Sequence, residues 1–400
     1  MWDKLFLRIL KSALMGERFV CDTPIPSEGW EHICRLAQEH KVLPLVYDAV
    51  YDDPSFREFQ PEGIRSAVRL MTMQQVNRTS NFLSVYKSLC DSHFAPIVVK
   101  GIVCRQLYPK PDLRQSSDED LLVPPKDFPR YSEILTELGL ISAKPGEYQT
   151  SFVRSDGLYL ELHSSLFSVA SDYFNSWNRL FQDSAHRTEV ITVDSVSVRT
   201  LSPDDHLLYL ILHALKHFLH SGTGIRQICD IVMFANCYGK DINWEKLFSD
   251  CKSLNAEKFA AAIFAIGSKY LNFDPKVACY PAKWQKVNPD PEPMLADILG
   301  AGVYGSSSMS RRHSSSITLD AVQGNSTRIT RRLFPPAKQL NKKYSYATKS
   351  PLLLPVAWSH RLLSYGMETK GRKDNSPSAS LRIGKERLAL LDLYGLLNSK

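Results

Sequence analysis

The chain has 400 residues, of which 44% are hydrophobic and 23% charged, as in a globular protein with a sizeable core. No apolar run reaches the roughly 18 residues of a membrane helix, so the sequence predicts no membrane partner. The N-terminal residues carry charges throughout, unlike a secretion signal, and the eight cysteines form no Cys-x-x-Cys pair. These features argue against a zinc ribbon and a disulfide framework, and they predict a cytoplasmic location.

The net charge of +7 is uneven, because the positive excess lies in residues 311–400. Such a basic segment is typical either of a surface that contacts nucleic acid or another polyanion, or of an ordinary solvated surface. It contains no recognisable RNA-binding motif, so both interpretations stay open.

The predicted elements begin with a helical region over residues 1–85. Trp30, Ile33 and Leu36 recur at helical spacing, and Ser27 is the predicted N-cap of that helix. A further helix is predicted from about residue 62 to 92.

The pattern of apolar residues changes at about residue 86, and residues 86–200 are predicted to form a compact α+β core. Short apolar runs alternate with helical spacing, and Asp156-Gly157 is a strong hairpin signal. The predicted strands are 95–101, "APIVVKG", and 118–123, "DEDLLV", with helices at 102–108 and 126–139 and hairpins at 148–163 and 189–201.

Helical signals return over residues 201–302, with predicted N-caps at Ser202 and Asn243. Residues 303–330 are rich in Ser, Gly and Arg, which indicates a flexible linker or loop. Residues 331–400 are predicted to form a basic C-terminal helical region that ends in a short amphipathic helix.

The stretch "RQSSDEDLLV" places acids at the start of a predicted buried strand. Because side chains alternate along a strand, Asp118 and Asp120 point to one face and Glu119 to the other. Two such carboxylates can hold Mg²⁺, with water and phosphate completing its shell. A third acid on a neighbouring strand would permit a second ion. Glu161 offers that acid, since in "LYLELH" it shares the polar face with Tyr159 and His163.

Lys100 and Gly101 stand between a predicted strand and a predicted helix. A glycine there allows backbone amides to approach a phosphate, and the lysine adds a positive charge. Alone, these two residues are equally consistent with a tight turn and a solvated side chain.

Together, "VVKG", "RQSSDEDLLV" and "LELH" resemble the DNA polymerase β-like nucleotidyltransferases, and more closely a bacterial nucleotidyltransferase family within that superfamily. The likeness extends to "WEHICRLAQEHKVLPLVYDAV", "LSPDDHLLYLILHALKH" and "RRLFPPAKQL". It implies transfer of a nucleoside monophosphate from an NTP, such as ATP, with two Mg²⁺ (or Mn²⁺) ions.

The resemblance implies a role for each matching residue. Lys100, Gly101 and Arg114 fall on nucleotide-binding positions, Asp118 and Asp120 on the metal pair, and Glu161 on the third acid that activates the acceptor. Glu119 stands where an apolar residue is usual, and Glu161 replaces an aspartate. These departures keep a second interpretation open, a catalytically inactive module that binds a nucleotide or a partner.

The segment "HLLYLILHALKHFLH" places several histidines near one helical face. His213 and His217, at i and i+4, can reach one metal, and Asp230 can join them, which suggests a metal phosphohydrolase or a zinc site. The alternative is a helix contact or the rim of a nucleotide cleft, and the resembling family has matching residue types at His213, His217, Arg226 and Asp230. His163 is a further rim candidate. The sequence predicts neither the acceptor nor the oligomeric state.

Overall fold

The computed structural model describes residues 1–91, 95–146, 148–220, 222–287, 289–302, 311, 317–319, 321–323, 337, 340, 344, 346–369 and 377–397. Most of the predicted linker over 303–330 lies outside these residues, as does part of the basic region over 331–400. The predicted domain boundaries stay predictions.

The fold is α+β, as predicted from the sequence. Within the described residues, one mixed sheet has seven strands in the order β3-β4-β5-β2-β1-β7-β6. Neighbouring strands pair antiparallel except at β1–β7 and β2–β5, which are parallel. The strands are β1 (Ile97–Val99), β2 (Glu119–Leu122), β3 (Ile141–Pro145), β4 (Gln149–Val153), β5 (Tyr159–His163), β6 (Thr188–Val193) and β7 (Val196–Leu201).

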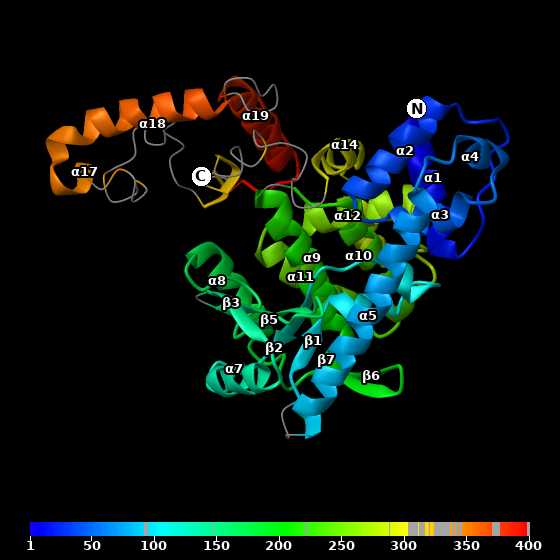
Figure 1. Cartoon of the computed structure of the whole chain (residues 1–400), viewed down its shortest axis with the longest axis horizontal. Coiled ribbons are helices and arrows are strands. Elements are labelled where there is room, and N and C mark those ends of the chain that lie inside the picture. The colour runs from blue at the N-terminus through cyan, green and yellow to red at the C-terminus, as the bar shows by residue number, and fades with distance from the viewer. Residues whose placement is uncertain are drawn as a thin grey trace.

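Helices precede, interrupt and follow the sheet. Helices α9 to α12 lie between the sheet and helices α1 to α4 (Figure 1), in agreement with the contacts of α9 with β7 and of α12 with α1. The helices are α1 (Trp2–Met15), α2 (Ser27–Glu39), α3 (Leu43–Val50), α4 (Pro54–Phe59), α5 (Ile64–Asp91), α6 (Gly101–Arg105), η1 (Pro111–Leu113), α7 (Phe128–Glu137), α8 (Asp172–Asn178), η2 (Arg179–Phe181), α9 (Pro203–His220), α10 (Ile225–Tyr238), α11 (Trp244–Ser253), α12 (Glu257–Tyr270), α13 (Ala282–Val287), α14 (Glu292–Ala301), α17 (Tyr346–Lys349), η6 (Pro351–Leu353), α18 (Leu354–Thr369) and α19 (Pro377–Leu393).

The two faces of the sheet have different partners. On one face, Leu121, Leu160 and Leu162 are buried in a core with apolar side chains of α5 and α7. Because side chains alternate along a strand, this commits Asp120 and Glu161 to the opposite face, on the side of α9 and α10. The leucine alternation in "LYLELH" therefore decides where the polar residues of β5 point.

Most predicted elements are confirmed, including both hairpins and the helix that begins after Ser202. The hydroxyl of Ser202 accepts a hydrogen bond from the backbone N–H of Asp205, and Asn243 caps α11 through the N–H of Lys246. The predicted N-cap at Ser27 is wrong: Ser27 is the first residue of α2, Pro26 is the N-cap, and no side chain caps that end. Strand β3 was not predicted.

Among the residues that the structure describes, no helix combines the length and the apolar character needed to span a bilayer.

Candidate active site

The candidate site is built on the parallel pairing of β2 with β5. In this register Asp120 lies directly opposite Glu161, and Leu122 opposite His163. Paired residues on adjacent strands place their side chains on the same face. The condition that the sequence left open, that these two strands be neighbours, is therefore met.

Asp118 lies just before β2, and among the described residues its carboxylate is not part of the group of ligand atoms that lie within 4.8 Å of one another. It lines one cavity together with Asp120 and a second cavity together with Glu161. Burial and the negative charge of Asp120 raise the pKa of Asp118. Burial would also raise the pKa of Asp120, but the ammonium of Lys100 and the ring of His163 outweigh it and hold that pKa at about 2. The two aspartates thus have different proton affinities.

His163 lies at the centre of this group, whereas the sequence placed it only at a possible rim. Its Nε2 is 3.0 Å from Asp120 Oδ1 and 3.5 Å from Glu161 Oε2. Among the described residues, ligand atoms of Asp120, Glu161 and His163 lie within 4.8 Å of one another, a spacing that suits a metal ion. Burial favours the neutral imidazole, but the hydrogen bonds to Asp120 and Glu161 prevail and raise the pKa of His163.

Glu119 points away from these acids and is a structural residue. Its carboxylate pairs with the buried guanidinium of Arg105 at 2.5 Å and accepts the backbone N–H of Ile102 at 2.7 Å. Its side chain is only 3% exposed. Glu119 therefore adds no third charge to the metal-binding face. It also accepts a hydrogen bond from a backbone N–H at the start of α6, where the sequence suggested a phosphate as the acceptor.

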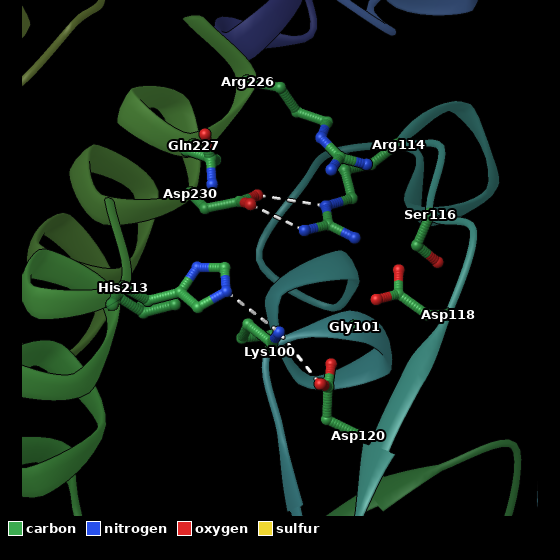
Figure 2. Close-up of a pocket in the computed structure, with 11 residues that line it drawn as sticks. Lys100, Gly101, Arg114, Ser116, Asp118, Asp120, His213, Arg226, Gln227 and Asp230 are labelled. Atoms are coloured by element: carbon green, nitrogen blue, oxygen red, sulfur yellow. Dashed lines mark hydrogen bonds and ion pairs between the residues drawn. The ribbon is translucent and has the colours of Figure 1, made fainter. Parts of the chain in front are cut away.

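Lys100 directs its ammonium into the acidic group. Its Nζ is 2.9 Å from Asp120 Oδ1 and 3.2 Å from His213 Nε2 (Figure 2). The backbone of Lys100 has φ 57°, a conformation that residues other than glycine rarely adopt. Its N–H donates to Nε2 of the buried His206 at 3.1 Å. A strained residue held in this way is typical of a functional site.

The two histidines at i and i+4 contact each other and Lys100. His213 Nε2 is 3.2 Å from both Lys100 Nζ and His217 Nε2. Because an ammonium only donates, His213 Nε2 is the acceptor and His217 donates to it. Burial and the nearby lysines lower the pKa of both histidines well below the usual value. This cationic neighbourhood disfavours the zinc site considered from the sequence.

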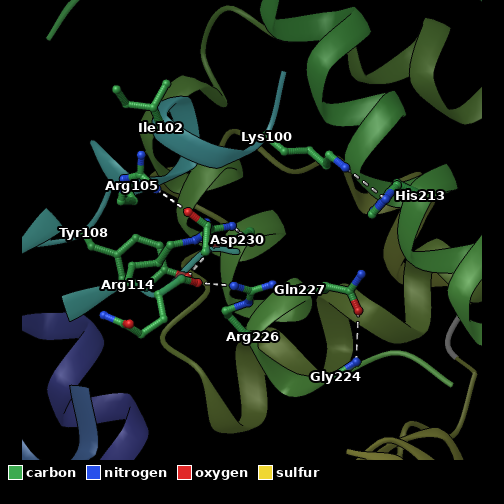
Figure 3. Close-up of polar contacts among 12 residues, drawn as sticks. Lys100, Ile102, Arg105, Tyr108, Arg114, His213, Gly224, Arg226, Gln227 and Asp230 are labelled. Atoms are coloured by element: carbon green, nitrogen blue, oxygen red, sulfur yellow. Dashed lines mark hydrogen bonds and ion pairs between the residues drawn. The ribbon is translucent and has the colours of Figure 1, made fainter. Parts of the chain in front are cut away.

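Asp230 is likewise unavailable for such a site, because it binds Arg114. Arg114 donates from Nε and Nη2 to the two carboxylate oxygens, at 3.0 Å and 2.6 Å, and the hydroxyl of Tyr108 donates to the same carboxylate (Figure 3). Arg226 donates to the carbonyl of Gln115. Two of the rim candidates, Asp230 and Arg226, therefore form or border one buried network.

This network leaves three buried donors without a hydrogen-bond partner among the described residues. They are Arg114 Nη1, Arg226 Nε and Gln227 Nε2. All three side chains line the cavity that also contains Lys100, Gly101 and Asp118, here named the arginine cavity (Figure 2). Because an unpaired buried donor is costly, an oxyanion in this cavity would stabilise all three.

A second cavity of about 490 Å³, here named the tyrosine cavity, opens beside Glu161. Its lining includes Arg78 from α5, Tyr148 before β4 and Lys216 from α9. Sequence reasoning missed these residues. Lys216 follows His213 by three residues on the same helical face, a signal that could have been used, whereas nothing local marks Arg78 or Tyr148.

A family model described as an uncharacterised nucleotidyltransferase matches residues 26–272 of the chain. The chain belongs to this family. The match includes the whole sheet, all three acids and the pair His213 and His217 of α9, so the resemblance predicted from the sequence is confirmed. Neither a curated protein nor a solved structure gives a significant match to the chain.

Membership in a nucleotidyltransferase family gives the arrangement a chemical context. The acids, Lys100 and the unpaired donors of the arginine cavity together offer ligands for a cation and for phosphate oxygens. The family description specifies neither the nucleotide nor the acceptor.

Proposed function

We propose that the protein transfers a nucleoside monophosphate from an NTP, such as ATP, to an acceptor. The observation that carries this proposal is the register that sets Asp120 beside Glu161, with Asp118 lining the cavities on both sides. These three residues are the proposed metal ligands, and their carboxylate oxygens are the donors that Mg²⁺ prefers and Mn²⁺ also accepts. A pair of such ions supplies charge neutralisation and in-line alignment of the transferred phosphoryl group.

The arginine cavity is the proposed site of the phosphates that leave as pyrophosphate. Arg114, Arg226 and Lys100 carry the positive charges that line it, and Gln227 adds an amide. The salt bridge to Asp230 fixes the guanidinium of Arg114 with Nη1 still unpaired. Donors held in place in this way stabilise developing negative charge without reorganising during the reaction.

In the proposed step, an acceptor oxygen forms a bond to the α-phosphorus of the NTP. The bond from that phosphorus to the bridging oxygen breaks, and the electron pair leaves with pyrophosphate. The proton of the acceptor hydroxyl passes to the carboxylate of Glu161, which lines a different cavity from the one that Arg114 lines.

Two residues, Glu119 and Glu161, favoured the alternative of an inactive module that binds a nucleotide, and one of them no longer supports it. Glu119 suggested a relaxed site, but it is buried in a salt bridge with Arg105 and faces away from the acids. Glu161 instead of aspartate is the remaining argument, and the experiment must therefore separate binding from transfer.

The test measures Mg²⁺-dependent ATP binding first, and then transfer of label from α-³²P-ATP, with γ-³²P-ATP as the control for phosphoryl transfer. Protein, RNA and metabolite pools serve as acceptors. We expect α-label transfer that Asp118→Asn and Glu161→Gln each reduce at least a hundredfold. Glu189→Gln, an exposed acid on β6, is the matched control and should retain the activity. Binding without α-label transfer in any pool would favour the inactive alternative, and absence of both would contradict the proposal.

A further inference from the structure

The tyrosine and arginine cavities share one wall. Lys100, Asp118 and His213 line both of them. On one side of this wall, the arginine cavity is narrow, about 30 Å³, and rich in donors. On the other side, the tyrosine cavity measures about 490 Å³ and includes Glu161.

We propose that the tyrosine cavity binds the acceptor, and that this acceptor is a small molecule with a phosphate group and a planar ring. The inference depends on the proposed nucleotidyl transfer. In phosphoryl transfer the attacking and leaving oxygens lie roughly in line, on opposite sides of the phosphorus. If pyrophosphate leaves into the arginine cavity, the acceptor approaches from the side of Glu161, which is the tyrosine cavity.

The phosphate specificity comes from Lys216 and Arg78. Lys216 Nζ is 3.3 Å from the hydroxyl of Tyr148, and Arg78 donates to the carbonyl of Ser116 at 2.8 Å. In the part of the chain that the structure describes, neither side chain forms an ion pair with a carboxylate. Burial and the charge of Lys100 lower the pKa of Lys216, although the carboxylates of Glu161 and Asp120 act in the opposite direction. Two cations beside one cavity match the two charges of a phosphate monoester.

The planar ring is inferred from Tyr148 and Tyr159, which line the same cavity. The backbone carbonyl of Tyr148 accepts two hydrogen bonds from Ser164, through its N–H at 2.9 Å and its hydroxyl at 3.2 Å. Aromatic rings that line a cavity offer a stacking surface for another ring. The volume falls within the roughly 300–1,000 Å³ of small-molecule sites, which favours a small acceptor over a polymer.

Phenyl phosphate is a suitable probe because it combines a ring with a phosphate dianion. Its binding to the full chain is measured by calorimetry without nucleotide, beside phenol and benzoate. We expect phenyl phosphate to bind at least tenfold more tightly than either compound. Lys216→Gln should weaken phenyl phosphate about tenfold and change Mg²⁺–ATP affinity less than twofold. Arg226→Gln should show the reverse pattern, and Lys252→Gln, an exposed lysine on α11, should change neither.

The crossed pattern separates this proposal from the preceding one. Equal binding of phenyl phosphate to the wild type and to Lys216→Gln would overturn the acceptor assignment, even if ATP binds normally. Tighter binding of benzoate would overturn the phosphate assignment. A wild-type protein that does not bind Mg²⁺–ATP would contradict the transferase proposal. The phenyl phosphate measurement could still be interpreted, because it is made without nucleotide. If Lys216→Gln does not fold by circular dichroism, Arg78→Gln gives the same comparison.

Discussion

The carboxylate of Glu119 occupies the space in which a side chain at Gly101 would begin. A Cβ on Gly101 would lie 2.0 Å from Glu119 Oε2, and the backbone there has φ +28°. Gly101 is therefore required by the carboxylate that holds the first turn of α6, whether or not a phosphate binds nearby. The glycine, Glu119 and Arg105 form one structural unit behind the acids.

Gly101→Ala is expected to destabilise the protein by about 2–4 kcal/mol, because the new methyl group clashes with Glu119 and the backbone conformation is unfavourable. Urea unfolding measures the effect. Gly300→Ala in α14 is the matched control: a Cβ there meets nothing within 4 Å, so we expect a neutral or slightly stabilising change. Equal stability of Gly101→Ala and the wild type would contradict this account of the turn.

Glu119→Leu should cost about 3–5 kcal/mol, because it leaves the guanidinium of Arg105 buried without its carboxylate. Adding Arg105→Met removes the isolated charge. We therefore expect the double variant to be more stable than Glu119→Leu, as measured by denaturant unfolding. A strictly additive further loss in the double variant would show that the ion pair is not the relevant interaction.

Asp230→Asn should destabilise the network beneath the arginine cavity by about 3 kcal/mol, since Arg114 loses its counter-ion. It should also weaken Mg²⁺–ATP binding, because the guanidinium is no longer fixed. Tyr108→Phe removes a single hydrogen bond to the same carboxylate and should cost about 1 kcal/mol. Similar losses for the two variants would argue against the charge of Asp230 as the main contribution.

Lys100→Met keeps an unbranched apolar stem of similar length and removes the ammonium beside Asp120. We expect α-label transfer to fall about 10²- to 10³-fold, because the group that faces both the acids and the arginine cavity is lost. Lys252→Met is the control for general effects of a lysine substitution. A Lys100→Met variant with full activity would exclude Lys100 from the transfer step.

His40 is expected to make stability depend on pH. It is fully buried, Nδ1 accepts the N–H of Ile225, and Nε2 donates to the carbonyl of Leu299. Burial lowers the pKa of His40 from 6.5 to about 4, although the hydrogen bond to Leu299 and the negative charge of Glu39 act in the opposite direction. Above pH 6.5 the ring is neutral in both states. Between pH 6.5 and 4 only the unfolded chain takes up the proton, so His40 contributes a loss of about 3 kcal/mol on acidification.

His40→Gln should reduce this slope between pH 6.5 and 4, although the variant is less stable at pH 8. His186→Gln, at an exposed position, should leave the slope unchanged. Urea unfolding at several pH values gives both results. An unchanged slope in His40→Gln would show that other groups dominate the acid response.

The local pattern of residues determined most elements around the site. Alternation of leucines predicted β5 and the face of Glu161, and Ser202 and Asn243 marked where two helices begin. These features depend on neighbours in the chain, so the sequence suffices. Strand β3 escaped prediction because its pairing with β4 shifts register between Ser142 and Lys144, which breaks the alternation. The prediction of Ser27 as an N-cap was wrong because a serine at the start of a helical pattern can also be the first residue of the helix.

Only the tertiary structure decided which side chains meet. Asp120 lies beside Glu161 because β2 pairs in parallel with β5, and the choice of strand partner is not a local property. The same holds for the pairing of Glu119 with Arg105, for Lys100 beside His213, and for Lys216 beside Tyr148. Periodicity fixes the direction of a side chain relative to its own strand or helix. Its partner is fixed by the packing of elements distant in the chain, and here that packing gives the buried Glu119 the guanidinium of Arg105 as its partner.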